Sequence, residues 1–416
     1  MEKILFFTSN YYPVAGANGI CSDEIMQELI ARGFEVHLIC YGDYNLQKEE
    51  IINGVFVYRI GMTLFHDLNV FSSNIQNFRL SEILRSIAFF MKRTKLLIYL
   101  PIYPVTSLYT IYKFYRQALK LHKRNDFKIV ISSFNPIEGL ISGHLLKKKF
   151  NNIKYVMYVL DSLSNTGSGK YLNSNLLQKI GWNWEKRFYS IADKILLMKS
   201  HENFHKMNRY DKFRNKMEFV DIPLLTNRFN TKLNNQEASK SIKIIYTGGL
   251  DSNRRNPQSA LEIFGKLIKQ NIQLDFYSRG DCESLIKEFE KKTSGKIARR
   301  GLISHEDSLV KIRESNFLLS IGNSNSDMIP SKIFEYMASG KPIIHFYKFE
   351  GDSSNPYLKK YPLALLINEN DDEKTNLMKI DKFMKANWNN RVEYDAIKEI
   401  FKRNTPEYTV DKILSN

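Results

Sequence analysis

The residues with the clearest chemical pattern lie between Ile329 and Ile344, in the segment IPSKIFEYMASGKPII. Pro330 suits the first position of a helix, where its missing N–H costs no hydrogen bond. Gly340 suits the left-handed residue that ends a helix, and Pro342 prevents the helix from continuing. The spacing therefore predicts a short helix that starts at Pro330.

The start of this helix is expected to bind phosphate. Unpaired N–H groups and the positive end of the helix dipole attract anions there. Ser331, Lys332 and Ile333 occupy the first turn, where a diphosphate could be held. Glu335 follows, and its carboxylate can accept two hydrogen bonds from vicinal ribose hydroxyls. On the residues alone an alternative stays open, in which Glu335 compensates the helix dipole and Lys332 is a solvated surface residue.

A second segment, YTGGL followed by RRNP, has a pattern suited to phosphate. Gly248 and Gly249 permit close approach of the backbone, and Arg254 and Arg255 each offer a planar fork of donors for phosphate oxygens. Gly280 follows a later apolar strand, and we expect it near the base or the phosphates.

The first half of the chain carries further candidates at the ends of predicted strands. Gly16 and Gly19 lie in a loop of small residues between a strand and a helix. Asp161 follows the apolar run 155–160, and the segment 135–138 (NPIE) follows the run 128–132. Because α/β folds place their sites at the carboxyl ends of strands, Asp161 is a candidate catalytic residue.

Two series of apolar strands and amphipathic helices must position these residues. The first opens with strand 4–8, helix 22–31 and strand 35–40, and the second restarts at strand 242–247. Buried parallel strands read as continuous apolar runs, so the pattern predicts an α/β fold with two Rossmann-like, doubly wound lobes facing across a cleft. The predicted parts are a first domain 1–225, a polar linker 226–241, a second domain 242–395 and a C-terminal helix 396–416 that packs toward the first lobe.

The bulk composition fits a globular protein with an acidic partner. The 416 residues are 43% hydrophobic and carry a net charge of +17, beyond what solubility requires. Three dispersed cysteines indicate neither a disulfide framework nor a metal site, and favour a reducing compartment. The N-terminal apolar run is too short for a signal peptide, and the run 96–112 is interrupted by prolines and falls short of the roughly 20 residues that span a bilayer. We therefore expect a cytoplasmic protein without a transmembrane helix.

The segment from Ile329 to Ile344 resembles the donor site of retaining glycosyltransferase family 4, which has the GT-B fold. In that family a glutamate in this stretch holds the nucleotide ribose, and Glu335 matches it. The family commonly has a second glutamate eight positions earlier, near the transferred sugar; Asp327 stands here and is the second candidate catalytic residue. The glycine loop 13–19 resembles the loop that lines the cleft in the family.

The resemblance extends to residues 246–257, which look like the strand, turn and helix that receive the diphosphate. The family has a basic residue directly after the first glycine of this turn, whereas this chain has Gly249, so the charge must come from Arg254, Arg255 or Lys332. The family often has a histidine in the first lobe near the segment 132–138. This segment contains no histidine here, so the sequence indicates no general base.

The resemblance implies that domain 1–225 binds the acceptor and domain 242–395 binds the nucleotide sugar. It implies a hexosyltransferase-type enzyme that moves a sugar from a UDP- or GDP-linked donor to a lipid-linked or polysaccharide acceptor in the synthesis of a capsule or lipopolysaccharide. It implies retention of configuration and no metal or other cofactor. Two alternatives stay open: a nucleotide-sugar epimerase of the same fold and a non-catalytic partner subunit.

Residues 79–128 form a basic and aromatic insertion that suits an anionic membrane surface. The alternative is a buried helical pair with solvated outer faces. Nucleic acid is a rival acidic partner, but the sequence has no helix-turn-helix, zinc-finger or RNA-module signature. We therefore expect peripheral attachment to the inner face of the cell membrane and no nucleic acid.

Overall fold

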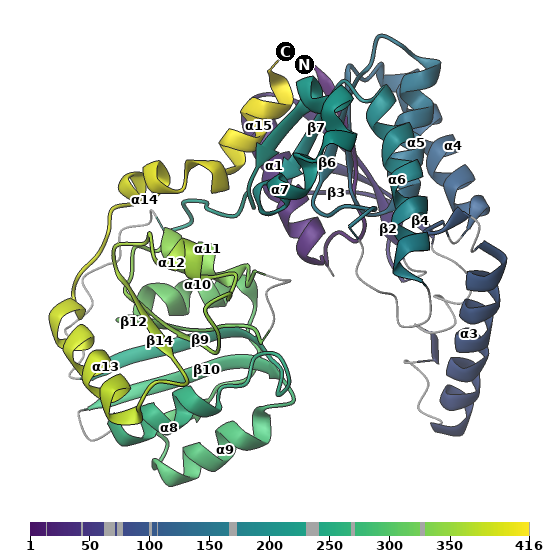
Figure 1. The fold of residues 1–416 in the computed structure, drawn as a ribbon. Helices are drawn as coiled ribbons and strands as arrows, with labels where there is room; N and C mark the ends of the chain where they lie inside the picture. Colours follow the sequence, from purple (N-terminus) through teal and green to yellow (C-terminus); the bar gives the residue numbers. More distant parts are fainter. Residues whose placement is uncertain are drawn as a thin grey trace. The chain divides into compact units, whose positions relative to one another are not determined.

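The chain forms two compact α/β units, Met1–Pro223 together with Pro406–Asn416, and Leu224–Thr405 (Figure 1). The computed structural model describes residues 1–13, 15–42, 45–61, 71–72, 78–99, 102–105, 107–165, 173–229, 241–267, 271–324 and 329–415, and within 78–99 it leaves out the side chains of residues 78, 92 and 95–97. Most of the expected linker, residues 230–240, lies outside the described residues.

The first unit is built on an eight-stranded sheet with the order β3-β4-β2-β1-β5-β6-β7-β8. Its strands are β1 (Lys3–Phe7), β2 (Glu35–Gly42), β3 (Glu49–Ile52), β4 (Val55–Gly61), β5 (Ile129–Ser133), β6 (Lys154–Val159), β7 (Lys194–Met198) and β8 (Met217–Val220). β3 pairs antiparallel with β4, and the other pairs are parallel. Four successive residues of β1, from Ile4 to Phe7, are fully buried, as expected for a strand covered on both faces.

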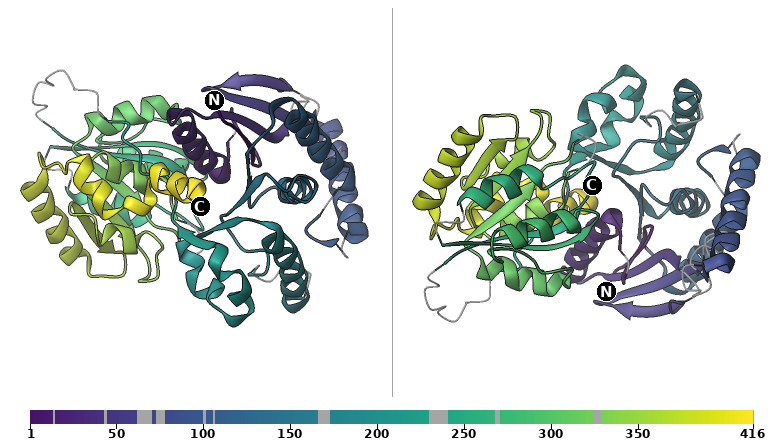
Figure 2. Two further views of the ribbon diagram at one scale, coloured as in Figure 1. Left: turned by 90° about the horizontal axis from the view of Figure 1, so that it is seen from above. Right: turned by 90° about the horizontal axis from the view of Figure 1, so that it is seen from below.

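The helices of this unit include one from the very end of the chain. They are α1 (Ala17–Ala31), α3 (Phe78–Tyr99), α4 (Leu108–Asn125), α5 (Ile137–Lys149), α6 (Ser174–Ile191), α7 (Glu202–His205) and α15 (Pro406–Leu414). α15 lies beside α1 (Figures 1 and 2), where the Arg32 Nη1 is 2.6 Å from the Asp411 Oδ1. The C-terminal helix therefore completes the first unit.

The second unit has a six-stranded sheet with the order β11-β10-β9-β12-β13-β14, in which every pair is parallel. Its strands are β9 (Ile242–Leu250), β10 (Ile272–Gly280), β11 (Ile297–Arg299), β12 (Phe317–Ile321), β13 (Ile343–Tyr347) and β14 (Ala364–Asn368). Its helices are α8 (Gln258–Leu267), α9 (Glu283–Lys292), α10 (His305–Glu314), α11 (Lys332–Ala338), α12 (Asn355–Leu358), α13 (Glu373–Asn387) and α14 (Tyr394–Ile400).

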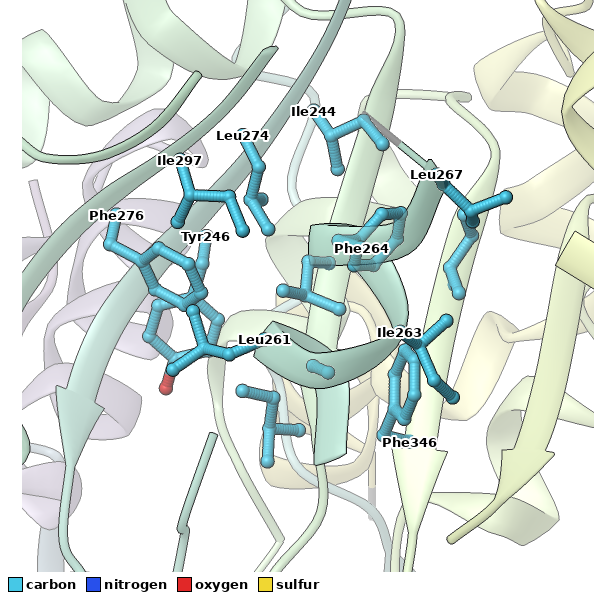
Figure 3. Packing of buried hydrophobic residues seen from close by; sticks show 14 of the residues in the cluster. Ile244, Tyr246, Leu261, Ile263, Phe264, Leu267, Leu274, Phe276, Ile297 and Phe346 are labelled. Carbon is cyan, nitrogen blue, oxygen red and sulfur yellow. The ribbon is translucent and has the colours of Figure 1, made fainter. Parts of the chain in front are cut away.

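One helix of this unit packs its apolar face on the sheet (Figure 3). Leu261 and Phe264 of α8 lie against Leu274 and Phe276 of β10 and Phe346 of β13, and all five side chains are fully buried. Burial of each such side chain contributes about 1.5–3 kcal/mol relative to exposure. This core packs on a sheet whose strands are all parallel, so the carboxyl ends of the strands lie at one edge of the sheet.

The α/β class and the two parallel Rossmann-like sheets predicted from the sequence are confirmed. Among the described residues, no helix has the length and apolar character needed to cross a membrane.

Candidate functional site

The helix of the IPSKIFEYMASG segment begins later than predicted. α11 runs from Lys332 to Ala338, with Ser331 as its N-cap, so the expected start at Pro330 is wrong by two residues. The segment before it is a turn, in which the Ile333 N–H donates to the Pro330 carbonyl at 3.2 Å. The Ile333 side chain is buried in the unit. At the predicted phosphate-binding end of the helix, Lys332 thus offers a charged side chain, whereas the Ile333 N–H is already bonded to the Pro330 carbonyl.

A lysine and a glutamate meet on the first turn of α11. The Lys332 Nζ lies 2.7 Å from the Glu335 Oε2, and 3.4 Å from the Ser308 Oγ on α10. The Glu335 side chain is 20% exposed, so solvent or a ligand can reach it. The pair places a cation and an acceptor of hydroxyl hydrogen bonds side by side.

A histidine that the sequence analysis missed faces the same carboxylate. The His305 Nδ1 is 3.9 Å from the Glu335 Oε1, and the Arg228 Nη1 is 3.0 Å from the His305 Nε2. Burial lowers the pKa of His305, so the ring is neutral near pH 7. Because Arg228 can only donate, Nε2 accepts and Nδ1 carries the proton that points toward Glu335. These residues stand 30 and more positions from Glu335, and no local pattern marked them.

Tyr336 fixes α11 against the end of β9. The buried Tyr336 hydroxyl accepts from the Thr247 N–H at 2.8 Å and lies 3.1 Å from the Thr247 Oγ1. Gly248 comes next, with φ +140°, and a Cβ built there would lie 3.9 Å from the Lys332 Cγ. The structure therefore brings the two glycines and the predicted helix together. The predicted turn at Gly248 and Gly249 is wrong, because both residues continue β9 and pair with Ser278 and Arg279 of β10. In the sequence Tyr336 has the pattern of a core residue, and its partner Thr247, 89 positions away, has no local signal.

Arg255 braces the end of β9 that carries Gly248 and Gly249. Its Nε and Nη2 lie 3.1 and 2.8 Å from the Asn323 Oδ1, and its Nη1 lies 3.3 Å from the Gly249 carbonyl oxygen. The Tyr246 hydroxyl donates to the same carbonyl at 2.9 Å. The guanidinium thus links the end of β9 to the residues that follow β12. A Cβ built on Gly249 meets no atom within 4 Å, so the strand is open on that side.

Arg254 and Gly280 have different surroundings. The Arg254 Nη2 is 3.1 Å from the Asp251 Oδ2, and its side chain is 60% exposed. Gly280 has φ +129°, and a Cβ there would lie 1.8 Å from the Leu250 carbonyl oxygen, so the approach of β9 to β10 demands a glycine. This backbone contact accounts for Gly280 without a ligand. Asp327, a candidate catalytic residue, lies outside the described residues.

The first unit holds the remaining candidates. Gly16 is the exposed N-cap of α1, whereas Gly19 lies inside that helix, so its assignment to the preceding loop is wrong. A Cβ on Gly19 would come within 2.2 Å of the Asn10 carbonyl oxygen. Glycine therefore allows the first turn of α1 to pass close to the backbone at Asn10. The Asp161 Oδ1 accepts from the Ser162 N–H at 2.8 Å, and the carboxylate is 63% exposed.

The polar groups at the carboxyl edge of the second sheet favour binding of an organic anion. Among the described residues, no cluster of His, Cys, Asp and Glu side chains is placed to hold a metal ion. The edge formed by the ends of β9 and β10 and by α11 presents Lys332, the open backbone of Gly249 and the accessible carboxylate of Glu335, whereas Asp251 and Asp281 there are bonded to Arg254 and Ser252. Cations and N–H groups suit phosphate oxygens, and the carboxylate suits hydroxyl groups.

The sequence matches no protein-family model and no curated protein. Solved structures share its fold over nearly the whole chain. A glycosyltransferase from Rickettsia africae ESF-5 superimposes with a TM-score of 0.60 at 13% identity, covering 100% of this chain and 99% of that one.

Two further solved structures have the same architecture. The UDP-GlcNAc 2-epimerase of Methanocaldococcus jannaschii has a TM-score of 0.55 at 12% identity, with 98% of each chain covered. WaaG, a glycosyltransferase involved in lipopolysaccharide biosynthesis, has a TM-score of 0.55 at 11% identity, covering 99% of this chain and 100% of that one. At these identities the likeness establishes the fold, and the chain therefore adopts the GT-B fold, with two Rossmann-like domains each built on its own sheet.

Proposed function

We propose that the chain is a glycosyltransferase that binds a nucleotide-sugar donor in its second unit. The observation that carries the proposal is the Lys332–Glu335 pair, with 2.7 Å between Nζ and Oε2, next to Gly248 and the open Gly249 at the end of β9. The GT-B fold supports it, because solved proteins of this shape include glycosyltransferases.

The proposed donor lies along the carboxyl edge of the second sheet. Glu335 accepts hydrogen bonds from the two ribose hydroxyls, since a carboxylate has several acceptor positions and one of its oxygens already faces Lys332. Lys332 and the backbone N–H groups at Gly248 and Gly249 stabilise the diphosphate. Arg254, with its exposed side chain, adds charge from the neighbouring turn.

The proposed transfer retains configuration and uses no metal. The leaving diphosphate takes the proton of the acceptor hydroxyl, while the protein positions both substrates and stabilises the positive charge that develops on the sugar. Asp327 and Asp161 are the carboxylates proposed to act on the reacting groups, and a hexose is the proposed transferred sugar.

Nucleotide binding tests the donor site. We expect Glu335→Ala to weaken UDP or GDP binding about 10- to 100-fold in isothermal titration calorimetry, the loss expected for hydrogen bonds to a charged group. Glu262→Ala is the matched control, because Glu262 is an exposed glutamate of α8 whose side chain bonds to Gln258 in the same unit. If the Glu335 variant binds both nucleotides as tightly as the unchanged protein, the assignment is wrong.

An epimerase is the second candidate, favoured by the similar shape of the UDP-GlcNAc 2-epimerase. It would convert a nucleotide sugar with no acceptor present. Incubation with UDP-GlcNAc alone, followed by NMR of the sugar, separates the two: a new epimer would replace the transferase proposal, whereas an unchanged donor is expected.

The proposed acceptor is a lipid-linked or polysaccharide glycan of the cell surface, reached from the inner face of the membrane. α3 supports attachment to a membrane, because its exposed residues Leu80, Ile83, Ile87 and Phe90 recur every three to four positions and form one apolar stripe. Arg79, Arg85 and Arg93 of the same helix are exposed and positive, which suits anionic headgroups.

A further inference from the structure

The first unit contains a pocket of its own, of about 380 Å³, at the carboxyl ends of β5 and β6. Aromatic side chains of Tyr41, Tyr103 and Phe134 line part of it, and the carboxylates of Glu138 and Asp161 line another part. Pockets that hold small organic ligands have this size and this mixture of apolar walls with a few polar groups.

Glu138 is the buried polar group of the pocket. It stands in the first turn of α5, is 3% exposed, and its Oε2 accepts from the Tyr41 hydroxyl at 2.6 Å. Burial raises the pKa of this carboxyl. The tyrosine holds one oxygen in place, so the carboxyl is oriented before any ligand enters.

Asp161 belongs to a loop that α6 holds rigidly. The Glu185 carboxylate, itself 2% exposed, accepts from the Ser162 Oγ at 2.6 Å, from the Ser164 Oγ at 2.5 Å and from the Ser164 N–H at 3.1 Å. The Tyr210 hydroxyl adds a fourth bond at 2.9 Å. A carboxylate with four donors fixes the backbone on which Asp161 stands.

Gly181 brings the same helix onto the loop. A Cβ at this position would lie 2.0 Å from the Leu163 carbonyl oxygen, so the backbone of α6 touches the backbone of the loop. Both Leu163 and Gly181 line the pocket. Its walls are therefore preformed by contacts that do not involve a ligand.

We propose that this pocket binds a sugar ring that carries no negative charge, as the terminal residue of the acceptor. Carboxylates accept hydrogen bonds from hydroxyl groups, and flat aromatic rings cover the C–H faces of a sugar. The described residues that line the pocket include two carboxylates and no Lys or Arg, and the His201 Nδ1 lies 4.0 Å from the Asp161 Oδ1. The charge of the carboxylates therefore disfavours a phosphate or an acidic sugar. An acyl chain would leave the buried Glu138 carboxyl facing hydrocarbon, which is costly. The inference rests on the proposed function, since it names the acceptor of that reaction.

Saturation-transfer NMR on the full chain tests the class of ligand. The probes are methyl α-D-glucopyranoside, methyl N-acetyl-α-D-glucosaminide and α-D-glucose 1-phosphate. We expect transfer to the ring protons of at least one methyl glycoside and a binding signal at least ten-fold weaker for the phosphate. Equal binding of the phosphate, or no transfer to either glycoside, would overturn the proposal.

Two variants locate the binding in this pocket. Tyr103→Ala should weaken glycoside binding about ten-fold; the Trp184 Nε1 donates to the backbone carbonyl of Tyr103, which the variant keeps. The double variant Glu138→Gln, Asp161→Asn should let glucose 1-phosphate bind, because it removes both charges. Asp211→Asn, at an exposed aspartate of the same unit, is the control and should change neither signal. Glycoside binding that survives Tyr103→Ala at full strength would contradict the proposal.

Nucleotide titrations of the same samples separate this inference from the donor assignment. Tyr103→Ala should bind UDP as tightly as the unchanged protein, and Glu335→Ala should keep its glycoside signal. If glycosides bind in the pocket and no nucleotide binds the chain, the proposed transferase function fails and the sugar pocket stands. If nucleotides bind and the pocket variants change nothing, the pocket assignment fails alone.

Discussion

At the scale of single residues, two neighbouring side chains of the candidate donor site have different proposed roles. Lys332 is a point charge beside the Gly248 backbone, and Glu335 is an acceptor 2.7 Å away. If Lys332 contacts phosphate and Glu335 contacts ribose, removing each should affect different parts of a nucleotide.

We expect Lys332→Met to weaken UDP binding about ten-fold, the effect of one charge-assisted hydrogen bond, and to leave uridine binding unchanged. Glu335→Ala should weaken both ligands. Calorimetry with UDP and with uridine measures the difference, and Lys266→Met, at an exposed lysine that pairs with Glu373, is the control. An equal loss for uridine would mean that Lys332 acts by positioning Glu335.

At the scale of elements, two helix-interior glycines have opposite surroundings. Gly181 on α6 has the Leu163 carbonyl oxygen 2.0 Å from where a Cβ would stand, whereas Gly265 on α8 would meet the Phe289 ring at 3.6 Å, an ordinary contact. The first glycine is required by backbone packing, and the second is not.

Gly181→Ala should therefore lower the free energy of unfolding of the first unit by about 1–3 kcal/mol, the usual cost of overpacking. Gly265→Ala should raise that of the second unit by up to about 1 kcal/mol, since alanine favours helix. Urea unfolding followed by tryptophan fluorescence measures both, because Trp182 and Trp184 lie on α6 and Trp388 follows α13. A neutral Gly181→Ala would show that α6 can shift away from the loop.

At the scale of the whole molecule, the net charge of +17 and the exposed apolar stripe on α3 both suit the proposed binding to an anionic membrane. The Arg93 guanidinium lies 4.6 Å from the Phe89 ring centroid, so a basic and an aromatic side chain contact each other on this helix. Figures 1 and 2 show α3 at the outer side of its unit. The helix offers an anionic bilayer both apolar contact and charge attraction.

Flotation with vesicles that contain phosphatidylglycerol should recover the protein at low salt, and recovery should fall with added salt as screening shortens the Debye length to about 10 Å at 0.1 M. Phe90→Ser should reduce partitioning about ten-fold or more, the effect of losing one buried aromatic ring. Met378→Ser, at a residue of α13 that is 58% exposed, should change nothing. Equal flotation with neutral vesicles would remove the electrostatic part of the proposal.

The sequence by itself determined the elements and the class of fold. Continuous apolar runs such as Ile4–Phe7 and the spacing of Gly340 and Pro342 act within a few residues, so strands, helices and their ends can be read along the chain. The errors are local as well: α1 begins five residues early and α11 two residues late, because turns and packing shift the ends of helices.

Only the tertiary structure decided which residues meet. Tyr336 reaches Thr247 across 89 positions, Arg255 reaches Asn323 across 68, and Glu185 bonds to Ser164, in the loop that carries Asp161, from 21 positions away. His305 has no sequence signature for the same reason, whereas Asp161 and the segment 135–138, both candidates at predicted strand ends, line the pocket of the first unit. Contacts between distant segments depend on how helices pack on a sheet, and the order of side chains along one strand or helix does not encode that packing.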